Sequence, residues 1–108
     1  MLYWSDQFNM PTKKQVSDKL YNVIDPELNL SIMDLGLVYD VKTTKKKVHI
    51  TMTLTSLGCP LFDTIKDDIL AEMEKLTVKE DDVEIELTFD PPWSMDLMSE
   101  SAKAMLGI

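Results

Sequence analysis

The chain has 108 residues, of which 44% are hydrophobic, so it has room for one domain with a packed core and none for a second folded unit. Its formal net charge of −8 at pH 7 argues against nucleic acid as a partner, because affinity for a phosphate backbone depends largely on Lys and Arg. No apolar stretch is long enough to cross a membrane, and one cysteine with one histidine excludes an internal disulfide and a four-ligand structural zinc site.

Residues 1–10 show no hydrophobic period and are expected to be a loose arm or a segment that docks on a partner. This stretch lacks the basic start and the apolar core of a secretory signal, so the expected compartment is the cytosol. Residues 11–108 are expected to form the single domain. Thr12 and Gln15 match a capping box, and apolar residues at helical spacing then predict a helix over residues 12–24.

An acidic connection follows this helix. Pro26 disfavours a helical conformation at the residue before it, so residues 25–34 are predicted to be irregular. The connection carries three carboxylates, at Asp25, Glu27 and Asp34. A loop carboxylate serves as a hard oxygen ligand, a general base, a helix cap or a solvated charge, and the sequence alone leaves these alternatives open.

The next segments predict two strands, over residues 35–42 and 47–55, joined by a short turn. In the second strand, apolar residues alternate with threonines, so one face is apolar and the other carries hydroxyl groups. Thr53 and Thr55 are therefore expected to project from the open face. This one-sided pattern indicates helices stacked on one face of a mainly antiparallel sheet.

Residues 60–76 predict a second helix, because a proline fits its first turn and apolar residues recur in steps of about four. Residues 83–89 alternate in the same way as the earlier strand and predict a third, half-buried strand. A last helix is predicted to be capped by Ser94 or Asp96 and to stop at Gly107. The predicted order is αββαβα, an α+β fold of two layers with a small mixed three-stranded sheet and helices on one face.

The single cysteine, Cys59, lies at the predicted start of the second helix. Unpaired backbone N–H groups and the helix dipole at that end favour an anion and lower a thiol's pKa. Asp63 and Asp67 lie one and two turns further on, and their negative charge acts in the opposite direction, as burial would. A lone cysteine is also often a small buried hydrophobe, so the residues alone leave a functional and a structural role equally open.

Other residues have the same two interpretations. Thr53 and Thr55 are expected to point toward the end of the sheet where Cys59 lies and to hydrogen-bond a sulfur ligand or a substrate, although threonine is ordinary on a wetted strand. Trp93 either covers this site or, in better keeping with its type, packs in the core. His49 is expected at the surface. Core packing rather than soft-metal binding is predicted for five methionines: Met33, Met52, Met73, Met98 and Met105.

Four short motifs occur in order along the chain. They are Asp25-Pro26-Glu27, Asp34-Leu35-Gly36-Leu37-Val38, Thr53-Leu54-Thr55-Ser56-Leu57-Gly58-Cys59-Pro60, and Pro91-Pro92-Trp93 with Met98-Ser99. Each is weak singly, but four in this order over a short chain are specific. From about Val16 to Ile108 the chain resembles the SufT/PaaD-like family, which includes the MIP-type eukaryotic cytosolic iron–sulfur assembly factors. The extra cysteine-rich C-terminal segment of PaaD is missing, so the chain most resembles SufT-like proteins.

The resemblance implies a role in maturing iron–sulfur proteins, by carrying a cluster or iron or by escorting client proteins to the assembly machinery, and it does not imply a turnover enzyme. It assigns the cluster or metal ligand to Cys59 and a supporting site to three acidic and two hydroxyl positions: Asp25, Glu27, Asp34, Thr53 and Thr55. Clusters are usually held by four thiolates, so the resemblance implies a labile cluster shared between two chains of a homodimer or with a partner. The implied partners are assembly proteins and client apo-proteins, with no nucleotide involved.

Two other functions are kept as alternatives. The first is a non-catalytic adaptor, in which the acidic connection and Trp93 dock client proteins to the assembly machinery. The second is a small thiol-dependent enzyme, which would need a base near Cys59, and His49 is the one histidine in the chain. No Ser/His/Asp set can be assembled around His49 by spacing, so an enzyme is not expected.

Overall fold

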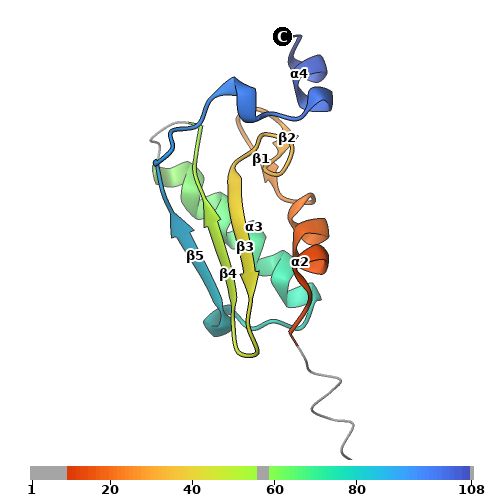
Figure 1. Cartoon of the computed structure of the whole chain (residues 1–108), viewed down its shortest axis with the longest axis vertical. Coiled ribbons are helices and arrows are strands. Elements are labelled where there is room, and N and C mark those ends of the chain that lie inside the picture. Colours follow the sequence, from red (N-terminus) through yellow and green to blue (C-terminus); the bar gives the residue numbers. More distant parts are fainter. Residues whose placement is uncertain (1–9, 56–58, 108) are drawn as a thin grey trace, which may run out of the picture.

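A small sheet backed by one long helix forms the centre of the computed structural model, which describes residues 10–55 and 59–107 (Figure 1). The sheet has the order β3-β4-β5, with β3 (Val38–Thr43), β4 (Val48–Met52) and β5 (Val83–Leu87). β3 and β4 are antiparallel, whereas β4 and β5 are parallel. The prediction of a mixed three-stranded sheet in an α+β fold is therefore confirmed, while residues 1–9 of the predicted arm lie outside the described residues.

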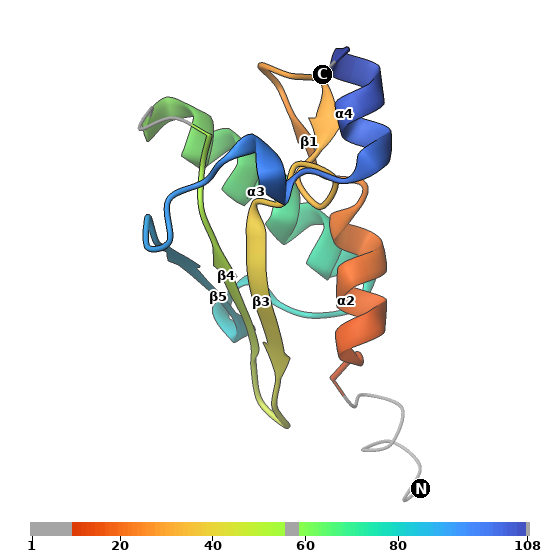
Figure 2. The same ribbon diagram turned by 45° about the horizontal axis from the view of Figure 1, so that its top comes forward.

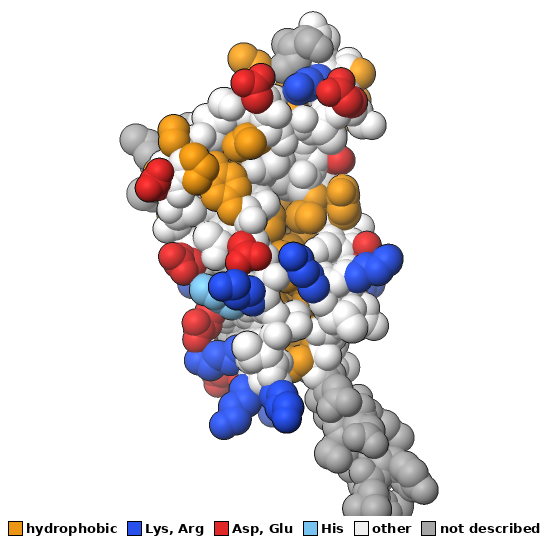
Figure 3. All heavy atoms as spheres, in the orientation of Figure 1, with side chains coloured by type: hydrophobic (Ala, Val, Ile, Leu, Met, Phe, Trp, Pro, Cys, Tyr) orange, Lys and Arg blue, Asp and Glu red, His pale blue; other side chains and the backbone are white. Residues whose placement is uncertain are grey.

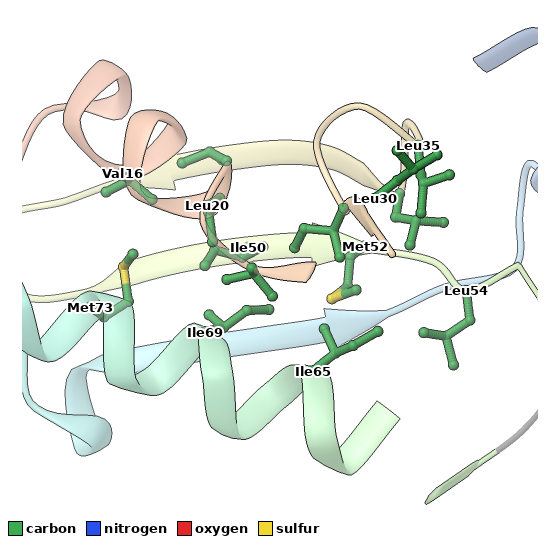
Figure 4. Packing of buried hydrophobic residues seen from close by; sticks show 14 of the residues in the cluster. Val16, Leu20, Leu30, Leu35, Ile50, Met52, Leu54, Ile65, Ile69 and Met73 are labelled. Carbon is green, nitrogen blue, oxygen red and sulfur yellow. The ribbon is translucent and has the colours of Figure 1, made fainter. Parts of the chain in front are cut away.

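The helix α3 (Cys59–Lys75) covers one face of this sheet. Its side chains Ile65, Ile69 and Met73 are fully buried, and Figure 4 shows them turned toward Ile50 and Met52 of β4. Apolar residues in steps of four lie on one face of the helix, and apolar residues in steps of two lie on one face of the strand, so the two apolar faces pack together. The predicted second helix and its apolar stripe are confirmed.

The first helix, α2 (Lys13–Leu20), packs against both β3 and α3 through the buried Val16 and Leu20. Its capping box is formed as predicted: the N–H of Gln15 donates to Thr12 Oγ1 (3.1 Å) and the N–H of Thr12 donates to Gln15 Oε1 (2.8 Å). The helix ends four residues before the predicted end.

The chain after α2 forms a small hairpin, and the prediction of an irregular connection over residues 25–34 is wrong in this part. β1 (Ile24–Asp25) pairs in antiparallel fashion with β2 (Leu30–Ser31). Val23, which extended the helical period, is buried before β1 rather than on the helix. Pro26 restricts Asp25 to extended conformations, which agrees with its place in a strand.

Two strand boundaries also differ from the prediction. β3 begins at Val38, because residues 32–36 form turns in which Gly36 has a φ of +74°. β4 ends at Met52, so Thr53 and Thr55 follow the strand rather than belong to it. Thr53 is fully buried, and its expected place on an open, wetted face is therefore wrong.

The C-terminal segment contains two short helical elements in place of one predicted helix. A 3₁₀ turn, η2 (Met95–Leu97), precedes α4 (Glu100–Leu106), and a further 3₁₀ turn, η1 (Glu80–Asp82), precedes β5. The cap of α4 is Ser99 rather than Ser94 or Asp96, because Ser99 Oγ accepts from the N–H of Ala102 (3.1 Å). Gly107 ends α4 in the left-handed region, as predicted.

The predicted core is correct for most methionines. Met52, Met73 and Met98 are buried, and Met33 packs against the core cluster. Met105 is 72% exposed, so its assignment to the core is wrong. This residue lies on α4, whose short length leaves only Ala102 buried.

Candidate functional site

Cys59 is the first residue of α3, the longest helix of the described chain. The first N–H groups of a helix have no partners within it, so this end attracts negative charge. Asp63 and Asp67 are exposed, which leaves their charges largely screened by solvent. The Cys59 side chain and residues 56–58 lie outside the described residues, so the site is built from the groups around this position.

Asp25 is fully buried in β1. Its Oδ1 accepts from the N–H of Glu27 (2.8 Å) and of Leu28 (3.2 Å), and its carbonyl oxygen accepts from the N–H of Asn29 (2.8 Å). These bonds hold the turn that joins β1 to β2, with Asn29 at a φ of +56°. Its second carboxylate oxygen, Oδ2, is buried and has no hydrogen-bond partner.

Thr53 provides a second unsatisfied group. Its backbone N–H donates to the carbonyl of Leu37 (2.8 Å), while its hydroxyl Oγ1 is buried and has no partner. Among the described residues, Asp25 Oδ2 and Thr53 Oγ1 are the two buried side-chain polar atoms in this condition. An unsatisfied buried group destabilises a fold by about 1–3 kcal/mol, so each such group in a folded chain calls for an explanation.

Backbone hydrogen bonds connect the segments that carry these two residues. The carbonyl of Val23, just before β1, accepts from Ile32 (2.9 Å), the carbonyl of Ile32 accepts from Leu37 (3.0 Å), and that of Leu37 accepts from Thr53. α3 in turn packs against β1. These bonds therefore connect the first two sequence motifs with Thr53 at the start of the third.

The fourth motif is attached to the turn at residues 34–36. Trp93 Nε1 donates to the carbonyl of Leu35 (2.6 Å), and the N–H of Ser99 donates to the carbonyl of Asp34 (2.7 Å). Ser99 Oγ also donates to Asp34 Oδ1 (3.2 Å). Figure 2 shows this C-terminal segment crossing the end of β3 and leading to α4 beside β1. Asp34 thus anchors the C-terminal segment.

The remaining predicted residues are placed more simply. Glu27 is exposed at the turn between β1 and β2, and Thr55 is half-buried after β4. Trp93 is half-buried and packs against the core cluster, which agrees with the core role favoured for it. Ser99 was not among the predicted site residues, although a serine directly before Glu100 is a typical helix-start signal.

His49 lies in β4, with its Nε2 3.2 Å from Glu86 Oε1 on β5. Its side chain is 34% exposed, in agreement with the predicted surface position. Within the described chain, no group of three or more His, Cys, Asp or Glu side chains is arranged to hold a metal ion. No helix in that part of the chain has both the length and the apolar character needed to span a membrane.

The described residues form a small α+β domain. Residues 13–87 match the family described as iron-sulfur cluster assembly protein, and the chain belongs to this family. The predicted resemblance is thereby confirmed.

Individual relatives are similar over nearly the whole chain. The Fe-S protein maturation auxiliary factor YitW of Bacillus subtilis is 44% identical over 97 residues, which are 89% of this chain and 94% of that protein. SufT of Staphylococcus aureus, also named an Fe-S protein maturation auxiliary factor, is 43% identical over 90 residues, 80% of this chain and 98% of its own. A domain of unknown function from Bacillus anthracis, of known crystal structure, has a TM-score of 0.81 at 39% identity and covers 89% of this chain and 92% of its own.

Proposed function

We propose that this chain is an auxiliary factor in the maturation of iron–sulfur proteins, in which Cys59 lends a thiolate to an iron ion or cluster that is passed to a client protein. Family membership and relatives named as maturation auxiliary factors support the process. The observation that carries the site is the pair of unsatisfied buried atoms, Asp25 Oδ2 and Thr53 Oγ1. Both belong to residues that the sequence motifs had already assigned to the site.

The chemistry of these groups suits a thiolate that binds and releases a metal. Binding of iron by Cys59 requires loss of the thiol proton, and the unpartnered Asp25 Oδ2 would offer a hard oxygen ligand in the same site. The Thr53 hydroxyl is a donor that would stabilise a thiolate or a sulfide by a hydrogen bond. The start of α3 favours the anionic sulfur, which is the form that binds metal.

A single thiolate makes the site a transfer site rather than a storage site. Iron–sulfur clusters are usually held by four thiolates, and this chain supplies one. The remaining ligands would come from a second copy, from a low-molecular-weight thiol or from the cysteines of a client. Assembly proteins and client apo-proteins are accordingly the proposed partners, and the proposed role is non-catalytic.

The first test is anaerobic reconstitution with iron and sulfide, with and without glutathione, for the wild type and Cys59→Ser. A visible chromophore with bound iron that depends on Cys59 is expected, and its stoichiometry gives the number of chains per cluster. No chromophore under any of these conditions would overturn direct carriage of a cluster. Full restoration of cluster-enzyme maturation by Cys59→Ser in cells that lack the protein would overturn the role of the thiol.

Thr53→Val tests the supporting site, because valine fills the same space without the unpartnered hydroxyl. The free energy of unfolding is expected to rise by about 1 kcal/mol while maturation falls. The matched control is Thr51→Val on β4, where the threonine is half-exposed, and maturation is expected to be unchanged. Unchanged maturation in Thr53→Val would remove Thr53 from the site.

An adaptor without cluster chemistry is the second candidate, supported by the exposed carboxylate of Glu27 and by exposed apolar residues after β5. It predicts that Cys59→Ser keeps its partners, whereas charge reversal by Glu27→Lys loses them. Pull-down of an assembly protein by both variants separates the two candidates. Loss of the partner in Cys59→Ser alone would overturn the adaptor.

A further inference from the structure

β5 forms a free edge of the sheet. It pairs with β4 on one side, and no other strand in the described residues pairs with it. The opposite edge, β3, is flanked by α2, as Figure 1 shows. An uncovered edge strand presents unpaired backbone groups to any extended chain that approaches it.

The register identifies which backbone groups are free. The N–H of Thr88 donates to the carbonyl of Met52 (2.8 Å), so Thr88 faces β4. The N–H and C=O groups of successive residues point to opposite sides of a strand. Those of Ile85 and Leu87 therefore point away from β4. Neither residue makes an outward backbone hydrogen bond to any other described segment.

On the open face of the sheet, the edge strand β5 carries acidic side chains. Across one register row, Lys42 of β3 lies beside His49 of β4, which lies beside Glu84 of β5. Lys47 Nζ is 2.6 Å from Glu84 Oε1, and the hydrogen bond from Lys47 lowers the pKa of Glu84, so this carboxylate is charged at neutral pH. The side chains of Glu84 and Glu86 remain 51% and 61% exposed. Cationic side chains on a strand beyond β5 would face these two carboxylates and form favourable cross-strand pairs.

The other face of the same edge is apolar. Ile85 is half-buried, and Leu87 and Phe89 remain 36% and 42% exposed. Beyond the charged strands, on the open face that Figure 3 views, hydrophobic side chains gather over the segment that follows β5, in which Met95 and Leu97 are exposed. An added strand would therefore have cationic side chains on one face and apolar side chains on the other.

We propose that the free edge of β5 binds an extended segment of a partner protein, in which Lys or Arg alternates with apolar residues, by addition as a fourth strand. Backbone hydrogen bonds at Ile85 and Leu87 would supply affinity, and the carboxylates of Glu84 and Glu86 would select the basic face. A second copy of this chain fits poorly, because antiparallel pairing centred on Ile85 sets Glu84 opposite Glu86 twice.

The carboxyl end of β5 lies beside that of β4, from which the chain continues to Cys59. A segment bound at this edge would thus extend toward the start of α3. That the partner is a client protein rests on the proposed function, whereas binding of a basic extended segment does not.

The test uses a capped synthetic peptide of alternating Lys and Val, with an alternating Glu and Val peptide for comparison. Binding of the Lys peptide is expected to slow hydrogen exchange at the outward amides of Ile85 and Leu87 by about ten-fold or more. Glu84→Gln/Glu86→Gln is expected to weaken binding about five-fold, since each exposed charge contact contributes modestly. The matched control is Glu80→Gln/Asp81→Asn in η1, which removes the same charge from the turn before β5 rather than from the strand, and it is expected to bind as the wild type does.

Four outcomes would overturn the proposal, and the first three concern the peptide. These three are peptide binding without protection of Ile85 and Leu87, equal weakening in the control variant, and equal binding of the Glu peptide. Self-association of the chain that protects the same amides in the absence of peptide would assign the edge to a second copy and would also overturn it. Cys59→Ser is expected to bind the peptide normally, so failure of this proposal can be told from failure of the thiol function.

Discussion

Replacement of Gly36 by alanine is predicted to detach the C-terminal segment from the rest of the domain. Gly36 has a φ of +74°, a conformation that destabilises an alanine by about 1 kcal/mol relative to glycine. A Cβ at this position would clash with the carbonyl oxygen of Leu97 and would lie 2.8 Å from its carbonyl carbon. Backbone atoms cannot rotate away as a side chain can, so residues near Leu97 must move.

The expected loss of free energy of unfolding in Gly36→Ala has two contributions. Overpacking of a close contact destabilises a protein by about 1–3 kcal/mol, which with the conformational contribution gives about 2–4 kcal/mol for Gly36→Ala. Gly107→Ala is the matched control, because Gly107 has a φ of +77° and nothing within 4 Å of an added Cβ. The free energy of unfolding of Gly107→Ala should fall by about 1 kcal/mol or less, since this variant has the conformational contribution alone and lies near the chain end.

Urea unfolding followed by circular dichroism measures both losses. The fluorescence of Trp93, recorded in a Trp4→Phe background, reports on the segment itself, because Trp93 Nε1 donates to the carbonyl of Leu35. A red shift in Gly36→Ala and none in Gly107→Ala is expected. Equal losses of stability in the two variants, or an unchanged Trp93 spectrum, would refute the close contact between Gly36 and Leu97.

Two further predictions concern α3. Thr77 follows the helix with a φ of +64°, where the N–H of Val78 donates to the carbonyl of Met73, so Thr77→Gly is expected to raise the free energy of unfolding by about 1 kcal/mol in urea titrations. The pKa of Glu72 is lowered chiefly by the hydrogen bond from Lys75 (2.8 Å). The charged carboxylate therefore stabilises the fold fully at pH values above the pKa of an unfolded glutamate, and this stabilisation is lost as the pH falls through the lower pKa of the folded state. The stability difference between wild type and Glu72→Gln should therefore shrink below about pH 4, as unfolding curves at several pH values would reveal.

Local signals in the sequence were sufficient where an element is long or has a specific cap. The alternation in β4, the four-residue steps of α3 and the Thr12–Gln15 capping box each depend on near neighbours, and each was predicted correctly. The hairpin of β1 and β2 was missed because two-residue strands carry no measurable period. Its pairing becomes favourable only once the hairpin packs on the rest of the domain.

The errors at the site come from contacts between distant residues. Asp34 and Ser99 are bonded although 65 residues separate them, and no local pattern announces such a contact. Thr53 continues the alternation of β4 as if it were wetted, but its burial depends on segments brought in by the fold. The motifs identified the right residues for attention, whereas their burial and partners required the structure.

The unsatisfied atoms at Asp25 and Thr53 and the free edge of β5 follow the same physical logic. Each leaves polar groups without partners, although a different sequence could have paired or replaced them. The two unsatisfied buried atoms destabilise the fold by about 1–3 kcal/mol each, which is a large fraction of a typical free energy of unfolding of about 5–15 kcal/mol. Such groups persist when a ligand or partner completes them. If this reasoning is correct, Thr53→Val gains stability and loses function together, a combination that a purely structural threonine would not produce.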